Sequence, residues 1–168
     1  KAVVFDIDGT LTSHDFEVVK DYTNIGTANY YQYAPELVNL YEQKGYVIVY
    51  LTGRPYWLAK DTRDWFNDYG FQDTQLRLTS NNSQSLPGEN TFVYKRDYLY
   101  YLKNTAGLNF ISAYGNAETD IQAYHAVGIP KNKTYIIGEN AGKENTIAID
   151  DDYQKHYQDK QNNLYCSQ

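Results

Sequence analysis

The sequence predicts a three-layer α/β fold, in which helices cover both faces of one parallel sheet. Short apolar runs of strand length recur along the chain, and amphipathic, helix-like stretches lie between most of them. Strands that alternate with helices usually pair in parallel through right-handed crossovers. Polar residues also follow several of the apolar runs directly, as is typical of the binding edge of such a sheet.

The expected strands are short apolar runs that turn or polar residues bound. The first of them, AVVFDI, runs straight into acidic residues, whereas a strand buried on both faces normally reads as a plain apolar run. The five runs lie at residues 2–7, 46–51, 76–80, 109–115 and 134–138.

The expected helices carry apolar residues at the spacing that places them on one face. The first begins near Pro35, which favours a first helical turn, and ends at Gly45. The second carries an apolar stripe that includes Leu58 and Trp65, and it ends at Gly70. The four helices are expected at residues 34–45, 56–70, 96–107 and 118–128.

The chain is long enough for one domain with a sizeable core, and it shows no internal repeat or second domain. We expect the core to span residues 1–150 and residues 151–168 to form a polar carboxyl-terminal tail. Residues 80–90, which are rich in serine and asparagine, are expected to form a loop.

Composition narrows the classes of partner. The formal net charge of -6 disfavours binding to nucleic acid through the overall charge of the domain. No stretch is long and apolar enough to cross a bilayer. The chain begins at Lys1 and contains no methionine, so a processed form that has lost an export signal stays open, and the sequence does not fix the compartment.

Residues that can carry chemistry follow three of the expected strands. Because parallel strands present their carboxyl ends at one edge of the sheet, these residues are expected to meet there. Carboxylates at the end of a buried strand are costly to bury without a positive partner. The set comprises Asp6 and Asp8 after the first strand, Thr52, Gly53 and Arg54 after the second, Asn116 and Asp120 after the fourth, and Lys95 in a helix between them.

These segments resemble the four ordered motifs of the haloacid dehalogenase (HAD) superfamily of phosphohydrolases, whose sheet is Rossmann-like. DIDGTLT is similar to the first motif, LTGR to the second, Lys95 to the third and GNAETD to the fourth. A narrower resemblance is to the lipin-type phosphatidate phosphatase catalytic region, also called the LNS2 domain. It rests on Asp15 close behind the first motif, on KRDYLYYLK and on GNAETDIQAY.

The resemblance implies a HAD-like fold, phosphatase activity and roles for the matching residues. Asp6 is expected to be the nucleophile that forms an aspartyl-phosphate, and Asp8 the general acid and then the general base. Because side chains alternate along an extended chain, both carboxylates are predicted to face one phosphorus. Lys95 is expected to offset negative charge on the nucleophile and the phosphoryl group.

The second motif is expected to bind the substrate phosphate. The Thr52 hydroxyl and the Gly53 amide can hold phosphate oxygens. For Arg54 two interpretations stay open, since its side chain can bind the substrate phosphate or brace the loop.

The expected cofactor is Mg²⁺, a hard cation that takes oxygen ligands. Its expected ligands are Asp6, the backbone carbonyl of Asp8, and Asp120. Such a cation would offset the repulsion between the neighbouring carboxylates. Thr10 lies in the loop after the first motif, and Asn116 is expected to orient Asp120 or a metal-bound water.

The sequence leaves no room for the cap domain that selects substrates in many HAD enzymes. Residues 11–35 accommodate a loop or short helix, and residues 54–95 are accounted for by a helix, a strand and one loop. An open site suits a large substrate, so the prediction is a capless, Mg²⁺-dependent phosphatase that acts on a membrane phospholipid such as phosphatidate.

Two alternatives remain. The first is a capless phosphatase that acts on phosphoproteins or nucleic-acid ends. The second is a non-catalytic LNS2-type module that binds phosphatidate. The presence of both Asp6 and Asp8 favours an enzyme, because a binding module needs neither a nucleophile nor an acid.

Overall fold

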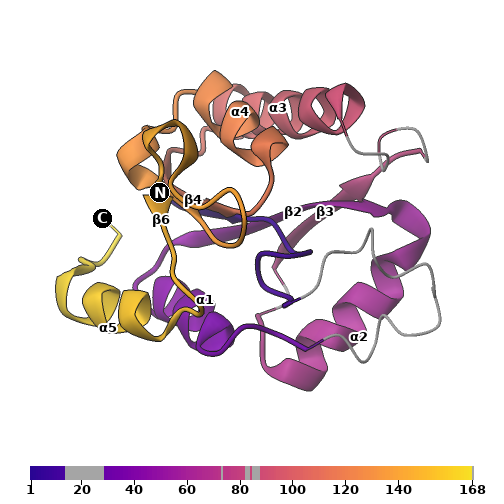
Figure 1. The fold of residues 1–168 in the computed structure, drawn as a ribbon. Helices are drawn as coiled ribbons and strands as arrows, with labels where there is room; N and C mark the ends of the chain where they lie inside the picture. The colour runs from indigo at the N-terminus through magenta and orange to yellow at the C-terminus, as the bar shows by residue number, and fades with distance from the viewer. Residues whose placement is uncertain (14–28, 73, 82–83, 85–87, 168) are drawn as a thin grey trace.

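The computed structural model describes residues 1–168 apart from 14–28, 73, 82–83, 85–87 and 168. The described residues confirm the predicted α/β fold and form a six-stranded sheet in the order β3-β2-β1-β4-β5-β6 (Figure 1). Every neighbouring pair of strands is parallel. The strands are β1 (Ala2–Phe5), β2 (Val47–Pro55), β3 (Gln75–Thr79), β4 (Phe110–Gly115), β5 (Thr134–Ile136) and β6 (Ile147–Ala148).

Strand β1 lies inside the sheet, between β2 and β4. Val3 is level with Ile48 of β2 and with Ser112 of β4. All residues of β1 are buried, which explains its uninterrupted apolar sequence. The chain that leaves β1 after Phe5 therefore emerges in the interior of the carboxyl edge, with a neighbouring strand on either side.

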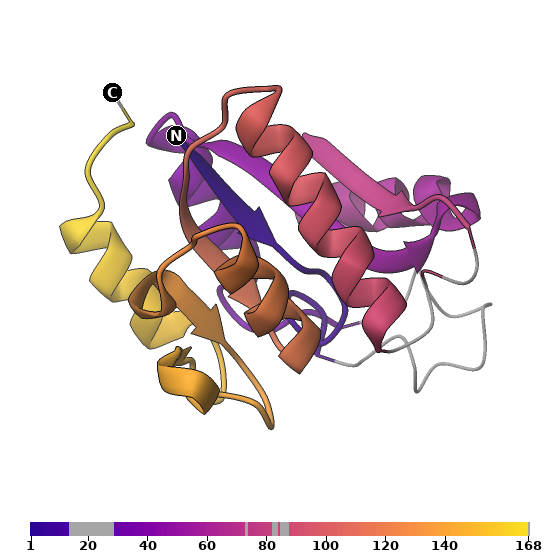
Figure 2. The same cartoon turned by 90° about the horizontal axis from the view of Figure 1, so that it is seen from above.

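Helices cover both faces of the sheet, as predicted. Figures 1 and 2 show α3 and α4 on one face and α1, α2 and α5 on the other. In the described part of the chain the helices are α1 (Ala34–Gln43), α2 (Ala59–Tyr69), α3 (Glu89–Asn104), α4 (Glu118–Ala126) and α5 (Gln154–Asn163). Helix α3 begins earlier than predicted, directly after Gly88, whose φ of 114° suits glycine and ends the loop.

The alternation of side chains along β1 builds two separate cores. Val3 and Phe5 pack in a cluster with residues of α1 and α2. Ala2 and Val4 pack on the opposite face in a cluster with residues of α3 and α4. Each core is a continuous apolar layer, and burial of this kind is the main favourable term in the stability of the domain.

Two elements near the carboxyl end were not predicted, namely β6 and α5. The sequence of α5 lacks the apolar stripe that signals a helix. In the structure none of its residues is buried. Tyr153, directly before α5, is buried and packs edge-on against Tyr31 and Tyr114. The region expected to form a polar tail thus contains a helix that an aromatic residue attaches to the core.

No inserted cap domain separates the elements in the described ranges, in agreement with the sequence. Residues 14–28, which belong to the segment where the sequence leaves room for a loop or short helix, lie outside the described residues. None of the helices that the structure describes is both long and apolar enough to cross a membrane.

Helix α5 also brings a partly buried histidine against the aromatic core. The His156 Nε2 atom lies 2.8 Å from the Tyr114 hydroxyl, and the ring packs on Tyr135. Burial lowers the pKa of His156 to about 4, and the nearby Lys160 ammonium lowers it as well. His156 is therefore neutral in the folded protein at pH values where it is protonated in the unfolded chain.

We predict that acid weakens the domain through His156. The unfolded chain binds a proton that the folded chain does not, so the free energy of unfolding falls as the pH drops from about 6.5 towards 4, by up to about 1.4 kcal/mol per pH unit. Urea unfolding across this range should show a flatter dependence for His156→Gln. The matched control is His125→Gln on the exposed face of α4. Equal slopes for wild type and His156→Gln would contradict the prediction.

Candidate active site

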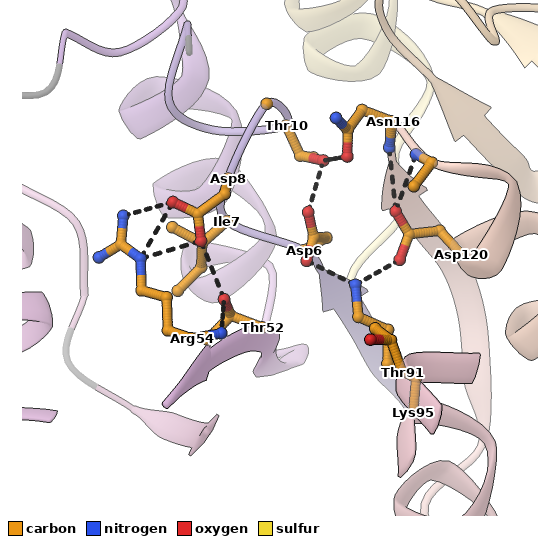
Figure 3. A network of polar contacts seen from close by, with 12 residues as sticks. Asp6, Ile7, Asp8, Thr10, Thr52, Arg54, Thr91, Lys95, Asn116 and Asp120 are labelled. Atoms are coloured by element: carbon orange, nitrogen blue, oxygen red, sulfur yellow. Dashed lines mark hydrogen bonds and ion pairs between the residues drawn. The ribbon is translucent and has the colours of Figure 1, made fainter. Parts of the chain in front are cut away.

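A buried lysine joins two of the predicted acids at the carboxyl edge of the sheet. The Lys95 Nζ atom lies 2.7 Å from the Asp6 Oδ1 atom and 2.6 Å from the Asp120 Oδ1 atom (Figure 3). All three side chains are buried. The structure therefore brings together residues from the end of β1, from α3 and from the first turn of α4.

Local structure fixes the direction of each of these side chains. The Asp120 Oδ2 atom accepts hydrogen bonds from the backbone amides of Asn116 and Ala117, each 3.1 Å long, and so caps the first turn of α4. Gly115 leaves space for this contact, because a Cβ atom there would lie 2.6 Å from the Asp120 Cβ atom. The glycine before Asn116 is thus required by a close approach.

Burial controls the charge of this cluster. It raises the pKa of Asp6 well above the ordinary value, and the carboxylates of Asp120 and Asp8 add to the rise although Lys95 opposes it. Burial acts to lower the pKa of Lys95, but its attraction to Asp120 and Asp6 outweighs this effect and keeps the pKa above the ordinary value. Two carboxylates share one ammonium group, so a further cation would offset the excess negative charge.

Asp8 is held by a different cation. Arg54 donates from Nε to Asp8 Oδ1 and Oδ2 at 3.0 and 2.9 Å and from Nη2 to Oδ1 at 2.7 Å. The Thr52 hydroxyl donates to Asp8 Oδ2 at 3.1 Å. Arg54 is only 2% exposed, and its Nη1 atom donates to the Thr62 hydroxyl. In this arrangement the arginine braces the loop that carries Asp8.

The two carboxylates of the first motif therefore point to different partners. Figure 3 shows Asp6 directed to Lys95 and Asp8 directed to Arg54. The sequence analysis predicted that strand alternation would turn both towards one phosphorus. Strand β1 ends at Phe5 and the chain enters a turn at Asp8, so the alternation does not extend to that residue. Both residues nevertheless line the same cavity.

Thr10 and Asn116 connect the first motif to the fourth. The Thr10 hydroxyl lies 3.0 Å from the Asp6 Oδ2 atom and 3.3 Å from the Asn116 Oδ1 atom. Gly9 between the motif acids and Thr10 has a φ of 71°, a conformation that glycine adopts readily. Asn116 thus contacts the loop after β1 through its side chain and Asp120 through its backbone.

A cavity of about 510 Å³ opens at this edge. Five of the predicted residues line it, namely Asp6, Asp8, Gly53, Lys95 and Asn116. The other predicted residues are buried, do not line the cavity and form hydrogen bonds with residues that do. They are Thr10, Thr52, Arg54 and Asp120. Asp15, part of the narrower resemblance, lies outside the described residues.

The donor set suits a hard divalent cation. Mg²⁺ is usually bound by one or two carboxylates and keeps several waters. Among the described residues, no group of three or more His, Cys, Asp or Glu side chains is arranged to hold a metal ion. A cation here would therefore rely on the two carboxylates of Asp6 and Asp120, on amide or carbonyl oxygens nearby and on water.

The sequence analysis missed the contribution of the loop after β5. Asn140 lines the cavity and donates from Nδ2 to the backbone carbonyl of Asn116 at 2.7 Å. Lys143, also at the cavity, contacts Asn140 and Glu118. Ligands bind at the carboxyl ends of parallel strands, and this rule applies to β5 as well as to the other strands. The polar residues that follow TYIIG could therefore have been predicted to lie at the site.

Tyr153 was also missed. Its buried hydroxyl donates to the backbone carbonyl of Thr10 at 2.9 Å, and its backbone amide donates to the carbonyl of Gln32. The residue before α5 therefore supports the loop that holds Asp6. No local sequence pattern predicts this contact, because it joins residues that are far apart in the sequence.

We predict that Tyr153→Phe loosens the loop after β1. The variant leaves the buried Thr10 carbonyl without its donor, at a cost of about 1 kcal/mol. Hydrogen exchange at the amides of Thr10 to Thr12 should accelerate about fivefold. Tyr41→Phe is the matched control, since its buried hydroxyl bonds to Tyr114 and not to the loop. Unchanged exchange in Tyr153→Phe would refute the role of this hydrogen bond.

Comparison with known proteins identifies the family of this chain. Residues 3–138 match the family described as PITM 1-3, LNS2 domain. The chain is 26% identical over 143 residues to membrane-associated phosphatidylinositol transfer protein 1 of Homo sapiens, covering 85% of this chain and 10% of that protein. It is 27% identical over 156 residues to phosphatidate phosphatase LPIN2 of Homo sapiens, covering 82% of this chain and 17% of that protein. The chain thus spans less than a fifth of the length of these relatives.

A solved structure shares the fold. The D,D-heptose 1.7-bisphosphate phosphatase from B. bronchiseptica, complexed with magnesium and phosphate, matches with a TM-score of 0.64 at 12% identity. The match covers 96% of this chain and 99% of that chain. At such low identity this likeness establishes the fold alone. The ordered motifs, the parallel sheet and the family match lead to one conclusion: the chain belongs to the LNS2 domain family and has the HAD-like fold.

Proposed function

We propose that this domain is a Mg²⁺-dependent phosphomonoester hydrolase that acts on a phospholipid such as phosphatidate. The observation that carries this proposal is the buried cluster of Asp6, Lys95 and Asp120, in which Asp6 and Lys95 line an open cavity together with Asp8. A nucleophile must be held rigidly and have its charge offset. The hydrogen bonds from Lys95 and Thr10 to the two oxygens of Asp6 serve both needs.

In the first half of the reaction, an Asp6 carboxylate oxygen attacks the phosphorus of the monoester. The bond between phosphorus and the ester oxygen breaks, and Asp8 gives a proton to the leaving oxygen. In the second half, water attacks the phosphorus of the aspartyl-phosphate, Asp8 accepts the proton, and the Asp6 carboxylate is released with inorganic phosphate. Lys95 and the Gly53 amide stabilise the charge on the phosphoryl oxygens.

Mg²⁺ would be held by the carboxylates of Asp6 and Asp120 and the backbone carbonyl of Asp8. The excess negative charge of the buried cluster supports this assignment, as does the oxygen-only character of the donors. Bound there, the ion would neutralise charge on the phosphoryl group. Asn116 would keep Asp120 in place through its backbone amide.

A membrane phospholipid is the substrate class that the site favours. The described residues place no cap over the cavity, so a headgroup can enter while the acyl chains stay in the bilayer. The names of the two human relatives, a membrane-associated phosphatidylinositol transfer protein and a phosphatidate phosphatase, support a phospholipid. The net charge of -6 argues against the nucleic-acid alternative.

One observation favours a second candidate, a non-catalytic module that binds phosphatidate. Both oxygens of Asp8 are occupied, since Arg54 and Thr52 donate to them. A general acid needs a proton on one of these oxygens, so Arg54 or Thr52 must release a hydrogen bond to Asp8 during turnover. A domain in which this release does not occur would bind phosphate without hydrolysing it.

We predict that Asp6→Asn abolishes hydrolysis and preserves the fold. The amide cannot act as a nucleophile, so phosphate release from phosphatidate in mixed micelles should fall at least about a thousandfold. Wild-type release should require Mg²⁺ and stop with a chelator. Asp97→Asn, which changes an exposed carboxylate on α3, is the matched control and should retain wild-type activity.

Each other outcome has a clear meaning. Undiminished release in Asp6→Asn would refute the nucleophile assignment. Activity on an aryl phosphate without activity on phosphatidate would retain the chemistry and remove the lipid. Inactivity on both substrates, together with binding to phosphatidate vesicles, would establish the binding module.

A second prediction separates the two interpretations of Arg54. If the arginine braces Asp8, as its contacts indicate, Arg54→Lys should lower kcat about 10- to 100-fold and leave KM within about twofold, because lysine cannot form the forked contact. Steady-state kinetics on a soluble aryl phosphate would measure both constants. A rise in KM at constant kcat would show instead that Arg54 binds the substrate phosphate.

A further inference from the structure

Two neighbouring aromatic side chains are exposed at the end of β2. Tyr56 is 58% exposed and Trp57 is 47% exposed, and both belong to the short 3-10 helix Tyr56–Leu58. Leu58, the next residue, is buried and anchors this turn to the protein. Tyrosine and tryptophan carry an apolar ring and a polar tip, and this combination favours the boundary between lipid and water.

The pair stands at the same edge of the sheet as the candidate active site. Gly53, three residues before Tyr56, lines the cavity. Figure 1 shows the end of β2 turning into α2 at the edge towards which β1 also points. A flat surface that touches Tyr56 and Trp57 would therefore lie at the same edge of the sheet as the cavity.

Another exposed aromatic pair occupies a different place. Tyr100 and Tyr101 are exposed near the carboxyl-terminal end of α3. Helix α3 runs from Glu89 near the cavity back to the start of β4, so this pair lies towards the opposite edge of the sheet. Exposure of aromatic rings alone thus does not distinguish Tyr56 and Trp57; their position at the carboxyl edge of the sheet does.

Charge does not provide the attraction at this surface. The domain carries a net charge of -6, and Lys60, in the turn after Trp57, is paired with Asp64. Long-range attraction to an anionic membrane is therefore weak. Contact with a bilayer must come from insertion of the aromatic rings, and such contact depends little on salt.

We propose that Tyr56 and Trp57 insert into the interfacial layer of a phospholipid bilayer and set the carboxyl edge of the sheet against it. The cavity then opens directly towards the lipid headgroups. The choice of a bilayer as the partner rests on the proposed function, in which the substrate is a membrane phospholipid. The aromatic pair takes the place of a cap, because the membrane itself closes the site.

The two tryptophans of the chain make the first test simple. Trp65 is fully buried, so a change in tryptophan emission on addition of vesicles reports on Trp57. Vesicles of phosphatidylcholine with phosphatidate should shift the emission to the blue, and brominated lipids should quench it. The shift should persist at high salt. No change in emission or quenching would overturn the proposal.

The second test compares two double variants. Tyr56→Ala with Trp57→Ala should weaken sedimentation with these vesicles at least tenfold and lower hydrolysis of vesicle-borne phosphatidate, and it should leave hydrolysis of a soluble aryl phosphate unchanged. Tyr100→Ala with Tyr101→Ala is the matched control and should behave as wild type. Equal binding by the two double variants would overturn the proposal.

The tests also separate this surface from the catalytic proposal. Emission and sedimentation report on the surface even when no phosphate is released. Weaker sedimentation of the double alanine variant with these vesicles, in a protein without turnover, would support the surface while the hydrolase assignment fails. Normal hydrolysis of vesicle-borne phosphatidate by the double alanine variant would support the hydrolase while the surface fails.

Discussion

The contact of Lys95 with Asp6 and Asp120 is the interaction on which the rest of the site depends. It joins the end of β1, the middle of α3 and the first turn of α4, segments that are 89 and 25 residues apart in the sequence. Removal of one partner from a buried ion pair leaves an uncompensated charge and typically costs about 3–5 kcal/mol. The three side chains are therefore interdependent: Asp6 and Lys95 line the cavity, and Asp120 holds Lys95 from the buried side.

The fold gives each acid of the first motif its own cation. Lys95 in α3 forms an ion pair with Asp6, and Arg54 near the end of β2 forms an ion pair with Asp8. This separation reduces the electrostatic repulsion between the two carboxylates, because each of them is paired with a cation. The two groups also differ in their surroundings: Asp6 is fixed within a buried network, whereas Asp8 would have to exchange partners in the proposed reaction.

The abundant tyrosines serve mainly as core residues that also connect elements. Tyr114 stacks between Phe5 and Tyr135 at centroid distances of 4.5 and 4.9 Å, and its hydroxyl bonds to Tyr41. Buried hydroxyls need a partner, and the hydroxyls of Tyr41 and Tyr124 also bond to other parts of the chain. Tyr153 extends this network to the loop after β1. Through it, helix α5, which lies beyond the residues that match the family, supports the candidate site.

The sequence by itself determined the α/β class, the first five strands and most residues of the candidate site. Alternating strands and helices force a parallel sheet, and residues such as Asp6, Asn116 and Asp120 follow strands that must end at one edge. Only the tertiary structure decided that Arg54 faces Asp8, that Asn140 supports Asn116, and that Tyr153 reaches Thr10. The physical reason is that strand and helix periods are local properties of the chain. The partner of a buried side chain depends instead on the direction in which distant elements present their donors and acceptors.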